Sequence, residues 1–501
     1  MTKFFDRLGI SIYYILIFII VCIGLFLRIR LYLHQLPVWH DEVALSLNIF
    51  ERPIYKLFYT LHYSQAAPPL FLVAIKIITN IFGINILSLR FIPTLAGCSS
   101  LLLFIPVLQN TFKSKLPVIV ALSLFAICGP LIYYSQEIKP YSSDVFFCIL
   151  ILFLINKINF NDKKNAIISS ILCFIIPLCS FPSVFMMVAA LGYKFLISEK
   201  KRKIKYSIYT GIPFCLSLFI LWLINHGIHS YMTSFDDWDN GFLKFSFDSF
   251  IYIISNYIDY LGYYSVGTLL IFLVGIFICF FKKEETAVIS VLCFIIVYFA
   301  SVFHLYPFIG RASIFFAPIA LLFIASIFEN NFNEYKDKYL PKITMLLKYI
   351  IFLFLIVQSF NIVDSYNRVS DLDYKLQDGY KHERLEREKD IITILDNFKQ
   401  GDEIVSTYEL YIHILFYNIM NKYNYHIDLA FDCNKFDELK DMVSNENFNN
   451  FWIVETYNPR HDTSIDYEKE YETILNNAGV KYKKYENNAT NIYYVENDNN
   501  K

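Results

Sequence analysis

The segment PPLFLVAIKIITNIFG, residues 68–83, decides how this chain is threaded through a membrane. It is apolar but only 16 residues long, whereas a membrane-spanning helix needs ~20 apolar residues. Lys76, Thr79 and Gly83 would lie on one face of a helix. A polar stripe of this kind is typical of a helix that lies in the membrane interface. We therefore predict a juxtamembrane helix over 68–83 that does not cross the bilayer.

The basic residues of the short loops favour the same topology. If the segment does not cross, the cytoplasmic loops contain fifteen Lys and Arg residues. If it does cross, those loops contain only Arg90, Lys139, Lys244 and Arg311. Because cytoplasmic loops are enriched in Lys and Arg, we predict a cytoplasmic N-terminus, an outer loop over about 30–89 and an extracytoplasmic C-terminus.

The composition is that of a membrane protein. The 501 residues are 56% hydrophobic and carry a formal net charge of -1, with no basic stripe, which argues against a nucleic-acid partner. Nine of the ten cysteines fall in apolar segments, so we expect neither a disulfide framework nor a zinc motif. Eleven spans are predicted, at 10–28, 91–112, 116–134, 144–159, 165–180, 182–198, 206–225, 261–281, 286–303, 311–328 and 345–363. The pair 165–198 is short and interrupted by Pro177 and Pro182, so these two segments are either spans or re-entrant.

The chain changes character near residue 364. Residues 1–363 form the predicted membrane domain, whereas 364–501 have the composition of a small soluble domain. Amphipathic helical patterns in this part alternate with strand-like runs at 404–407, 451–455, 481–485 and 492–495. We therefore predict a multi-span α-helical membrane protein with a small C-terminal α/β extracytoplasmic domain.

The predicted topology gathers unusual polar residues on the outer side of the membrane. Charged residues near membrane depth are costly and usually pair with one another or carry function. Each also has a plainer explanation: an acid pair at a helix N-terminus, a polar cap after a span, or arginines that snorkel to the interface. The residues concerned are Asp41, Glu42, Arg90, Gln136, Glu137, Lys139, Tyr141, Asp144 and Arg311.

Five motifs occur in a characteristic order within residues 38–160. They are Trp39-x-Asp41-Glu42, Pro68-Pro69-Leu70, Phe82-Gly83, Leu89-Arg90-Phe91 and Tyr134-Ser135-Gln136-Glu137-x-x-x-Tyr141. This series resembles the N-terminal module of the C-type (GT-C) membrane glycosyltransferases, and more narrowly the protein O-mannosyltransferase and aminoarabinose-transferase superfamily. The chain departs from the family at Ala67, where members commonly have His; His62 or Gln65 is the candidate to take its place.

The resemblance implies a function and a set of site residues. The donor would be a polyprenyl-phosphate sugar and the acceptor a glycan, a lipid or a protein, at the outer face of a bacterial-type plasma membrane. Asp41 would act as the base that takes the acceptor proton, with Glu42 in support. The donor phosphate and sugar would be bound by Arg90, Gln136, Glu137, Lys139, Tyr141 and Arg311.

A metal ion is not required by this chemistry, because basic residues can neutralise the phosphate. The alternative is a divalent cation held by His40, Asp41 and Asp144, as in oligosaccharyltransferase relatives. Two other functions compete with sugar transfer. A lipid-linked glycan polymerase or ligase would share many spans and outer arginines, and a transporter would place its charges near the middle of the spans.

Overall fold

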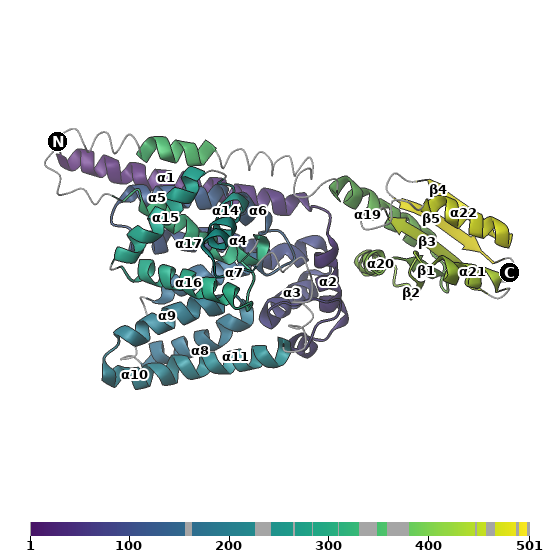
Figure 1. Cartoon of the computed structure of the whole chain (residues 1–501), viewed down its shortest axis with the longest axis horizontal. Coiled ribbons are helices and arrows are strands. Elements are labelled where there is room, and N and C mark those ends of the chain that lie inside the picture. Colours follow the sequence, from purple (N-terminus) through teal and green to yellow (C-terminus); the bar gives the residue numbers. More distant parts are fainter. Residues whose placement is uncertain are drawn as a thin grey trace. The chain divides into compact units, whose positions relative to one another are not determined.

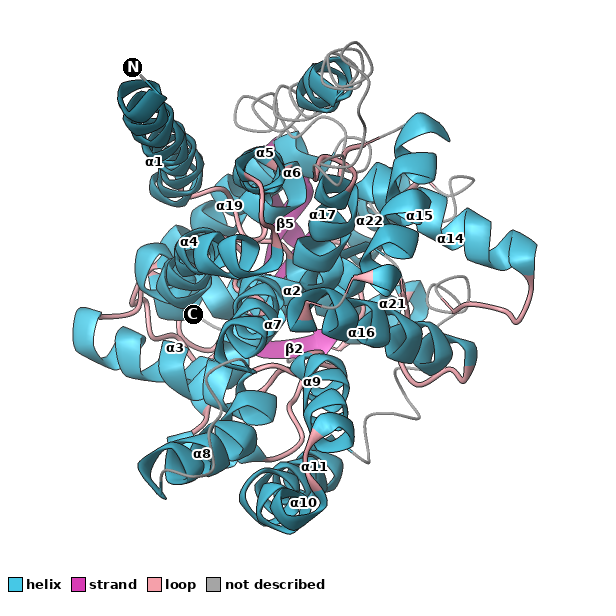
Figure 2. Ribbon diagram, turned by 90° about the vertical axis from the view of Figure 1, so that its left-hand side faces the viewer, coloured by secondary structure: helices cyan, strands magenta, loops and turns pink. Residues whose placement is uncertain are grey.

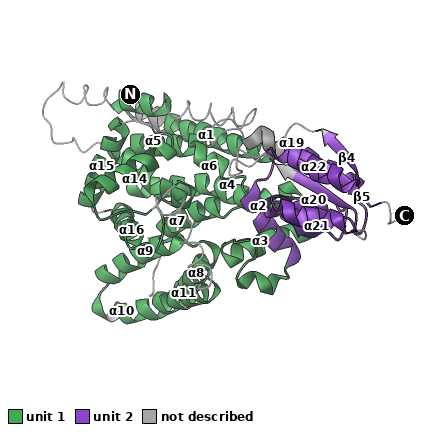
Figure 3. Cartoon of the chain, turned by 45° about the vertical axis from the view of Figure 1, so that its right-hand side comes forward, with its two compact units in different colours: residues 1–35, 52–370 green, residues 36–51, 371–501 purple. Residues whose placement is uncertain are grey.

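The computed structural model describes residues 2–155, 163–225, 242–263, 266–282, 284–308, 310–329, 348–357, 380–445, 448–456, 466–486 and 490–497. The chain divides into two compact units, which are coloured separately in Figure 3. Unit 1 comprises residues 1–35 and 52–370, and unit 2 comprises residues 36–51 and 371–501. Nothing in the sequence pattern predicts that the short segment 36–51 groups with residues so far along the chain.

Among the described residues of unit 1, all regular secondary structure is helical (Figure 1). Its helices are α1 (Thr2–His34), η1 (Ile54–Phe58), α3 (Pro69–Phe82), α4 (Ile86–Thr111), α5 (Lys115–Ile127), α6 (Gly129–Tyr133), α7 (Tyr141–Ile155), α8 (Lys163–Cys179), α9 (Ser183–Ile197), α10 (Lys200–Tyr206), the π-helical turn η2 (Ser207–Gly211), α11 (Ile212–Asn225), α14 (Phe247–Tyr260), α15 (Val266–Phe281), α16 (Glu285–Val302), η3 (Gly310–Phe316) and α17 (Ala317–Ser326). Helix α17 is buried along its whole length, so it lies in the core of this unit.

Four of the described helices are long and apolar enough to cross a membrane: Ser11–His34, Ile86–Thr111, Arg202–Ile224 and Glu285–Val302. Seven shorter apolar helices accompany them, among them α3, which occupies the segment 68–83. The predicted architecture, a helical membrane unit with a small C-terminal α/β part, is confirmed at this level. The number of eleven spans and the orientation of the termini stay predictions.

One predicted span, 116–134, is broken into α5 and α6 at Cys128. The cause is Pro130, which has no N–H and therefore cannot donate a hydrogen bond to the carbonyl of Ala126, four residues earlier. The break leaves the last carbonyls of α5 without intrahelical partners inside an apolar unit, where such groups are costly.

Two side chains from distant helices satisfy these carbonyls. The Arg28 guanidinium of α1, fully buried, donates to the carbonyl oxygens of Phe125 and Ala126 at 3.2 and 3.1 Å. The Tyr263 hydroxyl donates to the carbonyl of Leu124 at 3.2 Å. A positive charge is also favourable at the carboxyl end of a helix. Arg28 and Tyr263 therefore stabilise a helix break that the apolar sequence does not reveal.

Unit 2 contains a five-stranded sheet in the order β2-β1-β3-β5-β4, and its strands are labelled in Figure 1. Its strands are β1 (Glu403–Ser406), β2 (Asp428–Phe431), β3 (Phe451–Thr456), β4 (Lys481–Glu486) and β5 (Thr490–Glu496). β1 is parallel to both β2 and β3, and β5 is antiparallel to both β3 and β4. The four predicted strand-like runs correspond to β1, β3, β4 and β5, whereas β2 was not predicted.

The helices of unit 2 are α2 (His40–Glu51), α19 (Tyr380–Asn397), α20 (Tyr408–Met420), α21 (Phe436–Ser444) and α22 (Tyr467–Ala478). One hydrophobic core forms between the sheet and α21 and α22, where Val405, Ile453 and Tyr493 pack against Leu439 and Leu475. Helix α2 packs on α20, with the rings of Phe50 and Phe416 stacked 6.0 Å apart between centroids. Apart from α2, the helices and strands of this unit belong to the C-terminal part of the chain.

The contact between α15 and α17 yields the first prediction. An ideal Cβ on Gly275 would lie 2.0 Å from the carbonyl oxygen of Phe323, a backbone atom that cannot move aside. We expect Gly275→Ala to force the helices apart and to lower stability by about 1–3 kcal/mol, the cost of overpacking. The expected measurement is a lower thermal unfolding temperature of the detergent-solubilised protein. Gly192→Ala on α9, where a Cβ meets nothing within 4 Å, is the matched control; equal effects of the two changes would contradict the close packing.

Candidate functional site

The turn between α6 and α7 contains three of the six predicted donor-binding residues. Gln136, Glu137 and Lys139 are 2%, 1% and 6% exposed, so their polar groups lie inside the protein rather than in a solvated cap. The plainer explanation of this run as an exposed polar cap does not fit that burial. Ionised groups are buried only when other polar groups surround them, which makes this turn a candidate binding site.

Close packing of α4 against α7 holds the turn in place, and the two helices lie side by side in Figures 1 and 2. At Gly97 of α4, an added Cβ would lie 2.6 Å from the Cβ of Ser135 and 3.7 Å from Oγ of Ser142. The Ser135 hydroxyl donates to the carbonyl of Ile132 at 2.6 Å. Glycine at position 97 thus allows the backbone of α4 to approach the polar turn closely.

Lys139 contacts Gln65, the residue that the sequence offered beside His62 as a replacement for the missing family histidine. The Lys139 ammonium donates to Oε1 of Gln65 at 2.6 Å, and both side chains are buried, whereas His62 is exposed. The two residues before Gln65 have left-handed backbone, with φ of 60° at Tyr63 and 53° at Ser64. Non-glycine residues adopt this conformation only at a cost in free energy, and such residues cluster at functional sites.

A second group of predicted residues gathers around Tyr134. Its ring packs edge-on against that of Tyr141, with 5.0 Å between centroids. Tyr134 also lies within electrostatic range of Glu137 and of Arg311 at the start of η3, and η3 packs against α7.

Arg90, in the first turns of α4, is 1% exposed. A buried arginine is not a snorkelling one, so for Arg90 the plainer explanation fails.

The acid pair lies in unit 2, at the first turn of α2. Glu42 is buried, and its Oε2 accepts a hydrogen bond from the backbone N–H of Trp39 at 3.3 Å. A Glu at the third helical position that reaches back to the residue before the helix is half of a capping box. Glu42 therefore stabilises the start of α2, and Asp41 is the partly exposed member of the pair.

The residues suggested for a metal are divided between the units. His40 and Asp41 belong to unit 2, whereas Asp144 lies buried in the first turn of α7 in unit 1. Among the described residues, potential metal ligands come together at His40, Glu409 and His413. Neither Glu409 nor His413 was predicted, because residues on an amphipathic helix far along the chain give no spacing signal toward His40.

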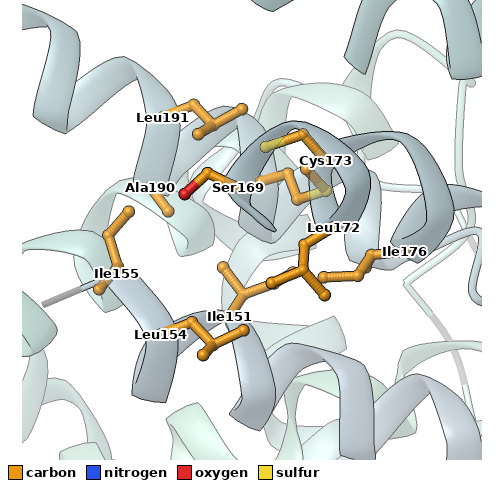
Figure 4. Close-up of a pocket in the computed structure, with 10 residues that line it drawn as sticks. Ile151, Leu154, Ile155, Ser169, Leu172, Cys173, Ile176, Ala190 and Leu191 are labelled. Carbon is orange, nitrogen blue, oxygen red and sulfur yellow. The ribbon is translucent and has the colours of Figure 1, made fainter. Parts of the chain in front are cut away.

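Helices α7, α8 and α9 enclose an apolar pocket (Figure 4). Ser169 and Cys173 contribute a hydroxyl and a thiol to it, and the other lining residues are apolar. The pocket offers no charged group to a phosphate, so we do not assign it to the polar end of a donor. Its lining consists of Ile151, Leu154, Ile155, Ser169, Leu172, Cys173, Ile176, Met187, Ala190 and Leu191.

Comparison with known proteins gives matches in structure and not in sequence. No protein-family model matches the chain, and no curated protein matches it. The crystal structure of ArnT from Cupriavidus metallidurans bound to undecaprenyl phosphate is similar with a TM-score of 0.56 and 8% identity, covering 97% of this chain and 98% of that one. The apo structure of the same protein gives a TM-score of 0.55 at 9% identity, covering 98% of each chain.

The oligosaccharyltransferase of Archaeoglobus fulgidus in its apo form is also similar, with a TM-score of 0.50 and 12% identity, covering 94% of this chain and 69% of that one. At such low identity these likenesses concern the fold. The fold of this chain is thus the GT-C fold that the sequence resemblance predicted.

The contact between Lys139 and Gln65 yields the second prediction. Gln65→Leu should leave a buried ammonium short of one acceptor, which costs about 1.5–3 kcal/mol for a bond to a charged group. We expect a lower thermal unfolding temperature, whereas Gln400→Leu, at an exposed glutamine of unit 2, should change it little. Adding Lys139→Met to Gln65→Leu removes both partners and should recover part of the loss. Strictly additive losses would argue against a direct bond.

Proposed function

We propose that this chain is an integral membrane glycosyltransferase that transfers a sugar from a polyprenyl-phosphate-linked donor to an acceptor at the outer face of the membrane, with inversion. One observation carries the proposal. The chain shares its fold along almost the whole of both chains with an ArnT structure bound to undecaprenyl phosphate. The burial of Gln136, Glu137 and Lys139, which the motif assigns to donor binding, supports it.

The donor phosphate is assigned to the polar groups of unit 1. As the bond from the anomeric carbon to the phosphate breaks, negative charge accumulates on the phosphate oxygens. Preformed positive charge in a water-poor environment stabilises that charge more strongly than it does in water. Arg90, Lys139 and Arg311 supply this charge. Gln136, Glu137 and Tyr141 are assigned to orienting Lys139 and to binding the sugar hydroxyls.

The acceptor is activated by Asp41 in this proposal. The carboxylate takes the proton of the acceptor hydroxyl while the acceptor oxygen bonds to the anomeric carbon. The carbon–phosphate oxygen bond breaks on the opposite side, and its electron pair leaves with the polyprenyl phosphate. A single displacement of this kind inverts the anomeric configuration. The leaving phosphate needs no protonation, so one base is sufficient.

A metal ion is not required for these steps.

The proposed orientation, with the N-terminus in the cytoplasm and the C-terminus outside, follows from the fifteen basic residues of the predicted cytoplasmic loops. It places both the acid pair and the turn at 135–139 on the outer side, where an acceptor of the cell envelope is available.

Replacement of the base is the third prediction. Asp41→Asn keeps the size of the side chain and removes its basicity, so we expect the rate of sugar transfer to fall about 10²–10⁴-fold. The measurement is the consumption of polyprenyl-phosphate sugars, supplied as a panel to the purified protein and followed by mass spectrometry. Asp437→Asn, in the first turn of α21, is a matched control at another helix start and should transfer at the wild-type rate. Near wild-type transfer by Asp41→Asn would exclude Asp41 as the base.

A further inference from the structure

His40, Glu409 and His413 form a compact group of metal-ligating side chains within unit 2. Their ligand atoms all lie within 4.8 Å of one another. His40 is the first residue of α2, and the other two lie four residues apart on α20. Residues at this spacing share one face of a helix, so α20 presents a carboxylate and an imidazole together toward the start of α2.

The local contacts agree with such a group. Nδ1 of His40 lies 4.0 Å from Oε1 of Glu409, and the two imidazole rings are nearly parallel, with 6.1 Å between centroids. His413 is 3% exposed, whereas the Glu409 side chain is 49% exposed. The Nδ1 atom of His40 is itself buried and makes no hydrogen bond to the described residues. The group therefore has a buried floor and an open side through which an ion and a water molecule can enter.

We propose that His40, Glu409 and His413 bind a divalent transition-metal ion, with Zn²⁺ as the ion that fits best. Two imidazole nitrogens and one carboxylate oxygen form a ligand set typical of Zn²⁺, with a fourth position left for water. Metal–ligand bonds of about 2.0–2.1 Å put tetrahedral ligand atoms about 3.3 Å apart. Binding would therefore draw the ligand atoms, which now lie within 4.8 Å of one another, closer together.

Arg387 of α19 sets a limit on the affinity. Its Nη1 lies 3.9 Å from the same Oε1 of Glu409. A bound dication would repel the guanidinium and compete with it for the carboxylate. The site therefore binds a metal ion less tightly than its ligands alone would allow, and removing the Arg387 charge should strengthen binding.

Metal binding here has a structural consequence. The ion would join α2 to α20 at the end of α2 that carries Asp41, one residue after His40. Its proposed effect is to hold the first turn of α2 in position. This differs from the oligosaccharyltransferase-like set of His40, Asp41 and Asp144, because Asp41 stays free of the ion. A bearing on sugar transfer rests on the proposed function, whereas the binding itself does not.

The fourth prediction tests the binding directly. Full-length protein without a histidine tag is stripped with a chelator in detergent and titrated with Zn²⁺ against a chromophoric indicator, with neither donor nor acceptor present. We expect one equivalent to bind with a dissociation constant of about 1 µM or tighter, and the ion to raise the thermal unfolding temperature. Failure to bind one equivalent at this affinity would overturn the proposal.

Variants distinguish this site from adventitious binding. His40→Ala, Glu409→Gln and His413→Ala should each weaken binding at least ~10–100-fold, the loss seen even when a residue outside the first coordination shell is replaced. His40 and Glu409 are partly exposed, so their variants test the site even if His413→Ala does not fold. His426→Ala is the matched control, because His426 is an exposed histidine of the same unit that faces Asp428 at 3.4 Å.

A further variant tests the proposed effect of the Arg387 charge on metal binding. Arg387→Gln should bind Zn²⁺ severalfold more tightly than the wild type. Unchanged affinity in the three ligand variants, or equal loss in His426→Ala, would contradict the site. Because none of these measurements needs sugar transfer, they succeed or fail separately from the assignment of Asp41 as a base.

Discussion

The bonds from Arg28 to the end of α5 are the interaction on which the membrane unit depends. A proline at position 130 breaks a helix within an apolar unit, where unsatisfied carbonyls are far more costly than at a wet surface. Arg28 and Tyr263 offset that cost, because they donate hydrogen bonds to three consecutive carbonyls, those of Leu124, Phe125 and Ala126. The break lies shortly before the polar turn at 135–139. Arg28 and Tyr263 thus stabilise the backbone that leads into the candidate site.

The same physical constraint shapes the site itself. Lys139 and Arg90 are charged and buried, which is unfavourable unless other polar groups are already in place. Gln65 is held beside Lys139 by two left-handed residues, and Gly97 lets α4 approach the turn. These features lower the stability of the fold, but they form the arrangement of polar groups before any ligand binds. Preorganised charge of this kind is what stabilises a developing phosphate anion most effectively.

Much of the architecture could be read from the sequence, because hydropathy and basic loops are properties of the linear chain. The apolar runs, the small C-terminal α/β part, four strands and the GT-C resemblance all follow from such local patterns. The break at Cys128 was missed because Gly129 and Pro130 sit within an apolar run that reads as continuous. Strand β2 is only four residues long and begins with Asp428, a poor strand former.

The site was harder to predict for physical reasons. The motifs pointed to Lys139 and Glu137, but their burial depends on how α4 and α7 pack. The conformation of Tyr63 and Ser64 has no signal in residue types, since neither is Gly or Asn. Likewise, Glu409 and His413 approach His40 only through tertiary structure. The eleven spans, the orientation and the roles of the site residues stay predictions.

The discontinuous composition of unit 2 affects how this protein can be divided. The segment that contains α2 lies in the sequence between Gln35 and Arg52, which both belong to unit 1, yet α2 packs on α20 of unit 2. A truncation after residue 370 would remove Phe416, which stacks on Phe50. It would also remove Glu409 and His413, the proposed metal ligands on α20. An exchange of the C-terminal part with that of a relative would fail for the same reason unless residues 36–51 moved with it. In this protein, a single cut in the sequence cannot separate the two units, because unit 2 is formed by two separate segments, 36–51 and 371–501.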